Sequence, residues 1–195
     1  NLLAQTQGEE EIYRELFESS KKEQAEAREE LLLLKSNLDL IKKRVDSLGA
    51  DFDPDEYKNL LDKTSRELYE FYLSAANNES VNKMAWPILP MQDKGISAYF
   101  RDENYKAWSG IPHDAIDVPT PQNTTMRSPL DCVTYKTQDN GFGYSYLILA
   151  CKGGYMLTFG HVTEFLTEEG QRVKTGEAVA LSGGMPGTKG AGHLT

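Results

Sequence analysis

Apolar residues recur every three or four positions along the first quarter of the chain. From residue 7 to residue 48 the intervening positions are mostly Glu, Lys and Arg. The positions that form this seam are Tyr13, Phe17, Ser20, Gln24, Ala27, Leu31, Leu34, Leu38, Ile41, Val45 and Leu48. This period predicts one long helix with a single apolar face, as in a coiled coil.

Such a helix would be about 60 Å long at 1.5 Å per residue, too long to bury against one small domain. We therefore expect it to pair with another helix, within the chain or in a second copy. Asp53 as N-cap and Pro54 at the first helical position predict a second helix that runs to about residue 76. Residues 77–80 predict a linker. The first 80 residues are thus expected to form a helical hairpin or coiled coil.

After Trp86 the pattern changes to short β-rich runs separated by Gly, Pro and Asn. Runs of this length and spacing predict a compact β-rich domain over residues 81–195, and hence an α+β chain. The turn Asp139-Asn-Gly141 predicts consecutive antiparallel strands. The strands are expected at 96–100, 132–135, 144–150, 155–159 and 178–181.

Charge and hydrophobicity argue against a nucleic-acid partner and against a membrane-spanning segment. The 195 residues carry a formal net charge of −9, and no basic stripe could neutralise the phosphates of a nucleic acid. No apolar run is long enough to span a membrane. Two cysteines, Cys132 and Cys151, are too few to staple a small domain; they could pair from neighbouring strands or stay as two buried thiols.

Three histidines occur in the chain, at positions 113, 161 and 193. His113 and Asp117 lie four residues apart, and His161 follows downstream. Imidazole and carboxylate groups suit Zn²⁺, and a catalytic zinc usually takes three protein ligands and one water. The spacing indicates two candidate ligands of such a site.

Five stretches of the second half follow one another in a recognisable order. They are Trp86-Pro87 with residues 95–100, His113-Asp-Ala-Ile-Asp117, Phe159-Gly-His161-Val162, the Val- and Gly-rich run 169–183, and the loop 184–190. In this order they resemble the domain entry, the His-x-Gly-x-Asp metal motif, the Tyr-x-His-Leu motif, the hairpin and the last loop of the LytM/lysostaphin-type zinc metallopeptidases. These enzymes cut the peptide cross-links of bacterial cell walls.

The resemblance implies a β domain of the duplicated hybrid motif type, with His113 and Asp117 as zinc ligands and His161 as a catalytic histidine. It also implies zinc as cofactor, peptidoglycan as substrate, and a location outside the cytoplasm or on a phage. Ala115 replaces the family's Gly and Phe159 its Tyr, and neither change removes a ligand.

The family closes its site with His-x-His, whose second His is the third zinc ligand. His193 could be the first of that pair, with Thr195 in the ligand's place, which would give a degenerate site. Alternatively, residues 190–195 form an inserted loop, and the third ligand is expected beyond Thr195. The lack of Gly-Pro before His193 favours the second arrangement.

Two functions follow from the resemblance. The first is a zinc endopeptidase that hydrolyses peptidoglycan. The second is an inactive regulator, because some relatives with a long coiled coil activate a cell-wall amidase at division. The ligand positions retained here favour the enzyme. Trp86, Trp108, Tyr144 and Tyr146 could line a substrate groove, although aromatic residues in a small β domain are more often part of the core.

Overall fold

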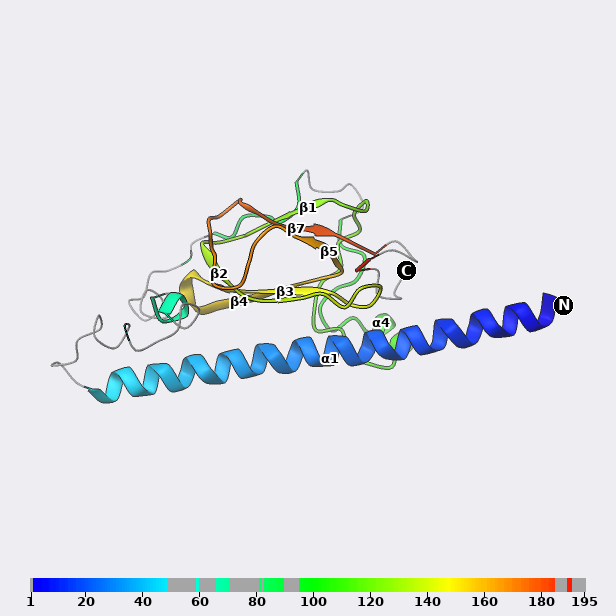
Figure 1. The fold of residues 1–195 in the computed structure, drawn as a ribbon, viewed down its shortest axis with the longest axis horizontal. Coiled ribbons are helices and arrows are strands. Elements are labelled where there is room, and N and C mark those ends of the chain that lie inside the picture. The colour runs from blue at the N-terminus through cyan, green and yellow to red at the C-terminus, as the bar shows by residue number, and fades with distance from the viewer. Residues whose placement is uncertain are drawn as a thin grey trace.

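A long helix and two small antiparallel sheets make up the described part of the chain (Figure 1). The computed structural model describes residues 2–48, 59, 66–70, 81, 83–89, 95–184 and 189–190. The named helices are α1 (Leu2–Leu48) and α4 (Glu103–Ser109). The strands are β1 (Thr125–Arg127), β2 (Cys132–Gln138), β3 (Tyr146–Cys151), β4 (Tyr155–Gly160), β5 (Val162–Phe165), β6 (Arg172–Val173) and β7 (Ala178–Ser182). The predicted α+β class is confirmed.

The strands form two sheets that enclose an apolar core. One sheet has the order β4-β3-β2-β6 and the other the order β1-β7-β5, and every pair is antiparallel. Figure 1 shows them as two layers, with the four-stranded sheet next to α1. The core between them contains Met126, Leu130, Cys132, Leu147, Leu149, Cys151, Val162, Val173, Val179 and Ala180. Since side chains alternate along a strand, the remaining residues of β3 face α1.

Most of the strands expected from the sequence are present. The predicted runs 132–135, 144–150, 155–159 and 178–181 correspond to β2, β3, β4 and β7, and β2, β3 and β4 pair consecutively as expected. The strand predicted at 96–100 is wrong, because this segment makes a single bridge, Ala98 with Asp117. Gly95 and Arg101 at its ends have φ of 66° and 59°, and left-handed residues of this kind interrupt an extended strand.

The predicted seam of α1 is its buried face over the part whose side chains are described. Ser20, Ala27 and Leu34 are buried, each seven residues after the last. Ala27 and Leu34 share an apolar cluster with Tyr146, Ile148 and Ala150 of β3. The outer face of the four-stranded sheet covers this stretch of the seam, and the expected pairing of α1 with another helix stays a prediction. Figure 1 shows α1 extending past the sheets at both ends.

The return helix expected over 53–76, and the linker 77–80, fall mostly outside the described residues. Residues 66–70 are described and are helical. Leu68 joins the cluster between α1 and β3, and Arg172 of β6 makes ion pairs with Glu67 and Glu70. The part of the predicted return helix that is described thus packs against the sheet as well as against α1. The division at residue 80 stays a prediction.

The two cysteines form a disulfide. Cys132 begins β2 and Cys151 ends β3, and the register of these strands places them directly opposite each other. Both are buried in the core between the sheets. Of the two alternatives that the sequence left open, the structure shows the paired one.

Packing of α1 on the sheet predicts a sharp contrast between two neighbouring leucines. Leu34 is 1% exposed and Leu33 is 53% exposed. Leu34→Ala should lower the free energy of unfolding by about 2–5 kcal/mol, because it leaves a cavity between helix and sheet. Leu33→Ala should change it by less than about 0.5 kcal/mol. Urea unfolding of both variants measures the difference, and equal effects would mean that α1 does not pack on the domain.

A pH effect on stability is expected at Asp131. Its Oδ1 accepts hydrogen bonds from the Thr175 backbone N–H at 2.8 Å and the Thr175 hydroxyl at 3.0 Å. The bond from the Thr175 backbone lowers the pKa of Asp131 below its usual 3.8. A lowered folded-state pKa stabilises the protein above the unfolded value, and this stabilisation is lost as the pH falls through the folded value.

Asp131→Asn should therefore lower the free energy of unfolding at pH 7 by about 1 kcal/mol, a value reduced for the partial exposure of the carboxylate. The difference from wild type should shrink as the pH falls below 3.8, and it is measured by urea unfolding across that range. Asp39→Asn, on the exposed side of α1, is the control and should have no comparable effect. A difference that does not depend on pH would contradict the assignment.

Candidate active site

The loop that carries His113 and Asp117 is held by backbone hydrogen bonds to the segment before α4. Asp117 N–H donates to Ala98 O at 2.9 Å, and Ser97 N–H donates to Asp117 O at 2.8 Å. Arg101 N–H donates to His113 O at 2.7 Å. These bonds hold the backbone at both candidate ligands. Residues 96–100 therefore position the motif although they do not form the predicted strand.

His113 is the best-defined side chain of the site. It is 6% exposed, and its ring stacks on Tyr105 of α4 with centroids 4.1 Å apart. Its Nδ1 lies 2.9 Å from the carbonyl oxygen of Tyr99, which can only accept, so Nδ1 carries a proton. In the neutral imidazole, Nε2 then has a free lone pair.

That lone pair faces a carboxylate. His113 Nε2 lies 3.2 Å from Asp117 Oδ1. Two electron pairs at this distance repel each other unless a proton or a cation lies between them. Two ligand atoms at 2.0–2.1 Å from a tetrahedral zinc are about 3.3 Å apart, so the observed spacing fits a shared zinc ion. The carbonyl of Tyr99 is also the kind of partner that orients a metal-binding histidine.

The described residues do not supply a third ligand. Among them, no three His, Cys, Asp or Glu side chains converge closely enough to hold a metal ion. His193 and Thr195, whose roles the sequence left open, lie outside the described residues. Lys189 and Gly190 are described: Gly190 N–H donates to Gly141 O at 2.7 Å, and Thr163 Oγ1 donates to Lys189 O at 2.8 Å. The chain thus returns to the β2–β3 turn shortly before His193.

His161 lies between β4 and β5 with a backbone φ of 54°. A positive φ is uncommon for residues other than glycine, and His is among the types that adopt it more often. Its ring meets the ring of Tyr144 edge to face, with centroids 5.0 Å apart. Phe159, which replaces the family's Tyr, packs against the core between the sheets. His161 is not in contact with the His113–Asp117 pair in any interaction that the described residues show.

Tyr144 joins the two parts of the site electrostatically. Burial raises its pKa well above the usual 10, and the charge of Asp117 and then the neighbouring Tyr105 raise it further. Burial followed by Asp117 also raises the pKa of Tyr105. Both phenols therefore stay neutral at physiological pH. The sequence indicated Tyr144 only as an aromatic residue of a substrate groove or of the core. Nothing in the sequence predicted its contact with His161.

The helix α1 reaches the metal motif through Asp114. This carboxylate, next to His113 in the chain, pairs with Arg28 of α1 at 2.6 Å and with Arg101 at 2.8 Å. Phe17 of α1 also meets Trp108 of α4 edge to face, with centroids 5.8 Å apart. A single exposed ion pair contributes little, but two cations on one carboxylate and an aromatic contact fix this side of the site to α1.

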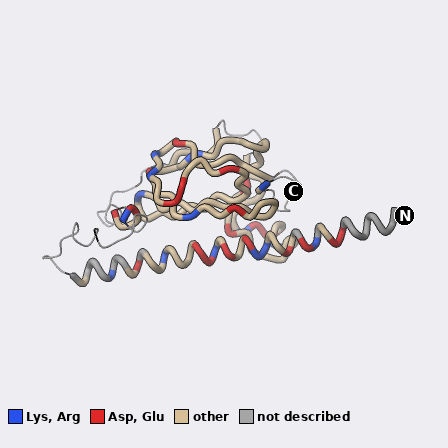
Figure 2. The backbone as a smooth tube through the Cα atoms, in the orientation of Figure 1, with Lys and Arg blue, Asp and Glu red and all other residues tan. Residues whose placement is uncertain are grey.

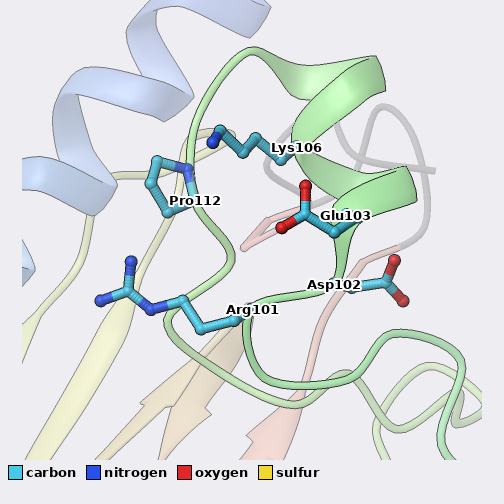
Figure 3. Close-up of a pocket in the computed structure, with 5 residues that line it drawn as sticks. All are labelled: Arg101, Asp102, Glu103, Lys106 and Pro112. Carbon is cyan, nitrogen blue, oxygen red and sulfur yellow. The ribbon is translucent and has the colours of Figure 1, made fainter.

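A pocket of about 120 Å³ is lined by Pro112, the residue before His113, and by four charged residues (Figure 3). Two cations, two anions and a proline line it: Arg101, Lys106, Asp102, Glu103 and Pro112. Asp102 caps α4, since its carboxylate accepts from the backbone N–H groups of Tyr105 and Asn104, and these bonds lower its pKa. The pocket therefore contains both positive and negative side chains, and its wall includes Pro112, which precedes the candidate metal ligand His113 in the chain.

The other aromatic candidates differ in exposure. Trp108 is 64% exposed on α4, whereas Tyr146 is buried in the cluster under α1. The indole nitrogen of Trp86 is buried. Of these, Trp108 alone presents a large apolar surface beside the metal motif. Ala115, which replaces the family's Gly, is exposed.

Comparison with known proteins agrees with the resemblance seen in the sequence. Residues 111–195 match the model of peptidase family M23. Over 72 residues the chain is 28% identical to the peptidoglycan DD-endopeptidase ShyA of Vibrio cholerae, and the match spans 37% of this chain but only 17% of ShyA. A crystal structure from Pseudomonas aeruginosa, described as a candidate M23 peptidase, is 21% identical with a TM-score of 0.36, covering 66% of this chain and 52% of that one.

Residues 111–195 of this chain are thus similar to the M23 peptidases. The matched region includes His113, Asp117 and His161. No described helix is both long and apolar enough to cross a membrane. Acidic and basic side chains are interspersed along α1 (Figure 2).

Proposed function

We propose that this protein is a zinc-dependent endopeptidase that hydrolyses peptide bonds of peptidoglycan. The observation that carries the proposal is the facing pair of His113 Nε2 and Asp117 Oδ1, 3.2 Å apart, with Nδ1 held by Tyr99. A proton alone could satisfy this pair, but the spacing and donor types suit zinc, and the M23 family is typically zinc-dependent. The third ligand would come from residues that the structure does not describe.

In this proposal, different residues of the chain bind the metal and transfer the proton. His113 and Asp117 would hold the metal, and Tyr99 and Tyr105 would keep the His113 ring in place. Zinc, when bound, supplies a Lewis acid that polarises the scissile carbonyl and makes water a better nucleophile. His161 would move a proton or support the developing negative charge, as an imidazole side chain can. No Ser or Cys nucleophile is required.

Three further observations support this substrate and location. ShyA, to which 72 residues of this chain are similar, is a peptidoglycan endopeptidase by name. The mixed-charge pocket lined by Pro112 and four charged residues suits a peptide that carries both carboxylate and amine groups. The Cys132–Cys151 disulfide is typical of proteins outside the cytoplasm, which fits an envelope, secreted or phage-borne enzyme.

A second function is favoured by one observation. The contacts of α1 with Asp114 and Trp108 place a long helix directly beside the metal motif, as a regulator that presents this surface to an amidase would require. This alternative does not need zinc. It is weaker, because such a regulator has no use for the His113–Asp117 pair with Tyr99 behind it.

Zinc content distinguishes the two functions. The measurement is metal analysis of this chain and of a version extended through the residues encoded next. We expect one zinc per chain in the extended protein and its loss in His113→Ala and Asp117→Ala. Asp114→Asn, a change in the adjacent carboxylate, should retain zinc. No zinc in either protein would contradict the endopeptidase and leave the regulator.

Activity separates metal binding from catalysis. His161→Ala in the zinc-bearing protein should keep the metal but lower the rate of muropeptide release from purified peptidoglycan by about a hundredfold or more, the range of a lost general acid or base. Trp108→Ala is the comparison, since it removes an exposed side chain near the motif and should leave the maximal rate within about tenfold. Unchanged activity in His161→Ala would remove His161 from the mechanism.

A further inference from the structure

We infer that Tyr144, held in place by Glu23 of α1, is a positioning residue for His161. The inference rests on the proposed role of His161 in hydrolysis, and it gives α1 a part in that reaction. Tyr144 lies between the helix and the histidine: its backbone meets Glu23, and its ring meets the ring of His161.

The contact with His161 is specific in its geometry. The two ring planes are 89° apart with centroids 5.0 Å apart, which is a favoured edge-to-face arrangement. The Tyr144 ring also meets the ring of Tyr146, with centroids 6.1 Å apart and planes 30° apart. The side chain of Tyr146 is itself buried under α1. Tyr144 is therefore in contact with both a buried aromatic neighbour and the candidate catalytic histidine.

Gly160, the residue just before His161, makes room for Tyr144. A Cβ at position 160 would lie 2.5 Å from Cζ and 2.6 Å from Cε2 of Tyr144, far inside van der Waals contact, and would overlap the hydroxyl. Gly160 has no left-handed φ, so its lack of a side chain is required by this close approach rather than by its backbone conformation. The tyrosine ring thus packs directly on the backbone that leads into His161.

A second close approach holds Tyr144 from the other side. The Tyr144 backbone N–H donates to Glu23 Oε2 at 2.5 Å. The Glu23 carboxylate lies over Gly143, where a Cβ would be only 2.8 Å from the carboxylate carbon. Gly143 also lacks a left-handed φ. The Glu23 carboxylate, the end of a flexible side chain, therefore occupies the space that a side chain at position 143 would take.

This arrangement predicts that α1 supports catalysis. A helix acting only as a spacer would have no reason to approach Gly143 this closely. A helix acting only as a cover would block the site, and its detachment would raise activity. If α1 holds Tyr144 and Tyr144 holds His161, loosening the Glu23 contact should lower the rate without affecting the zinc ligands.

The first test reads the His161 side chain directly and does not depend on activity. The chain has three histidines, so proton–nitrogen NMR spectra of the imidazole rings contain signals from three side chains. Substituting each histidine in turn assigns these signals. Glu23→Ala and Gly160→Ala both leave the Tyr144 ring in the chain but should displace it. We expect each to shift and broaden the His161 signals while those of His113 stay unchanged.

Conservative variants and a matched control make this test specific. Glu23→Gln keeps an oxygen that can accept the Tyr144 N–H, and Tyr144→Phe keeps the ring, so both should preserve the His161 signals. Glu29→Ala removes an exposed carboxylate from the same helix and should have no effect. Unchanged His161 signals in both Glu23→Ala and Gly160→Ala would overturn the inference, whether or not the protein binds zinc.

The second test uses the zinc-bearing protein on purified peptidoglycan. Glu23→Ala should lower kcat by about ten- to a hundredfold with KM little changed, because misplacement of a catalytic group acts on the chemical step. Glu23→Gln should restore the rate. A rise in activity in Glu23→Ala would instead identify α1 as a blocking cover, and a change confined to KM would make it a substrate-binding wall; either result would overturn the inference. Absence of zinc or of all activity in the wild type would count against the proposed function alone.

Discussion

The packing of α1 on the outer face of the four-stranded sheet is the contact on which much of the remaining structure depends. Ala27 and Leu34 meet Tyr146, Ile148 and Ala150 there, so both faces of β3 are buried. The inner face belongs to the core between the sheets. A strand buried on both faces cannot shift its register without moving apolar residues out of one cluster or the other. The register of β3 therefore fixes the Cys132–Cys151 pair at one end and places Tyr146 opposite Gly160 at the other.

The same helix determines how the two halves of the site are supported. Arg28 binds the carboxylate of Asp114 in the metal motif, and Glu23, five residues earlier, binds the backbone of Tyr144. The two side chains of α1 have opposite charges and contact different loops. Arg28 contacts the loop before β1, and Glu23 contacts the loop before β3. Because α1 is a continuous helix, its side chains keep a fixed spacing, and the two loops are held relative to each other by one rigid element. The loops of His113 and His161 are thus both supported by α1, although the two histidines are 48 positions apart in the chain.

The sequence predicted the faces of the elements better than their partners. The heptad spacing identified Ser20, Ala27 and Leu34 as buried positions, because periodicity depends only on the helix itself. It could not show that a sheet covers Ala27 and Leu34. The strand at 96–100 was wrong because alternating apolar residues carry no information about the left-handed turns at its ends. The disulfide was undecided because it depends on the pairing of two strands.

The site divides in the same way between local and distant interactions. His113 and Asp117 could be named from five residues of sequence, since their relation is local. Tyr144 could not, because its position depends on Gly160 in the next strand and on Glu23, which lies 121 positions earlier in the chain. Both glycines that accommodate this contact have ordinary backbone angles, so they carry none of the turn signals by which a glycine is usually interpreted. A glycine without such a signal, directly before a candidate catalytic residue, indicates that another part of the chain packs against that backbone.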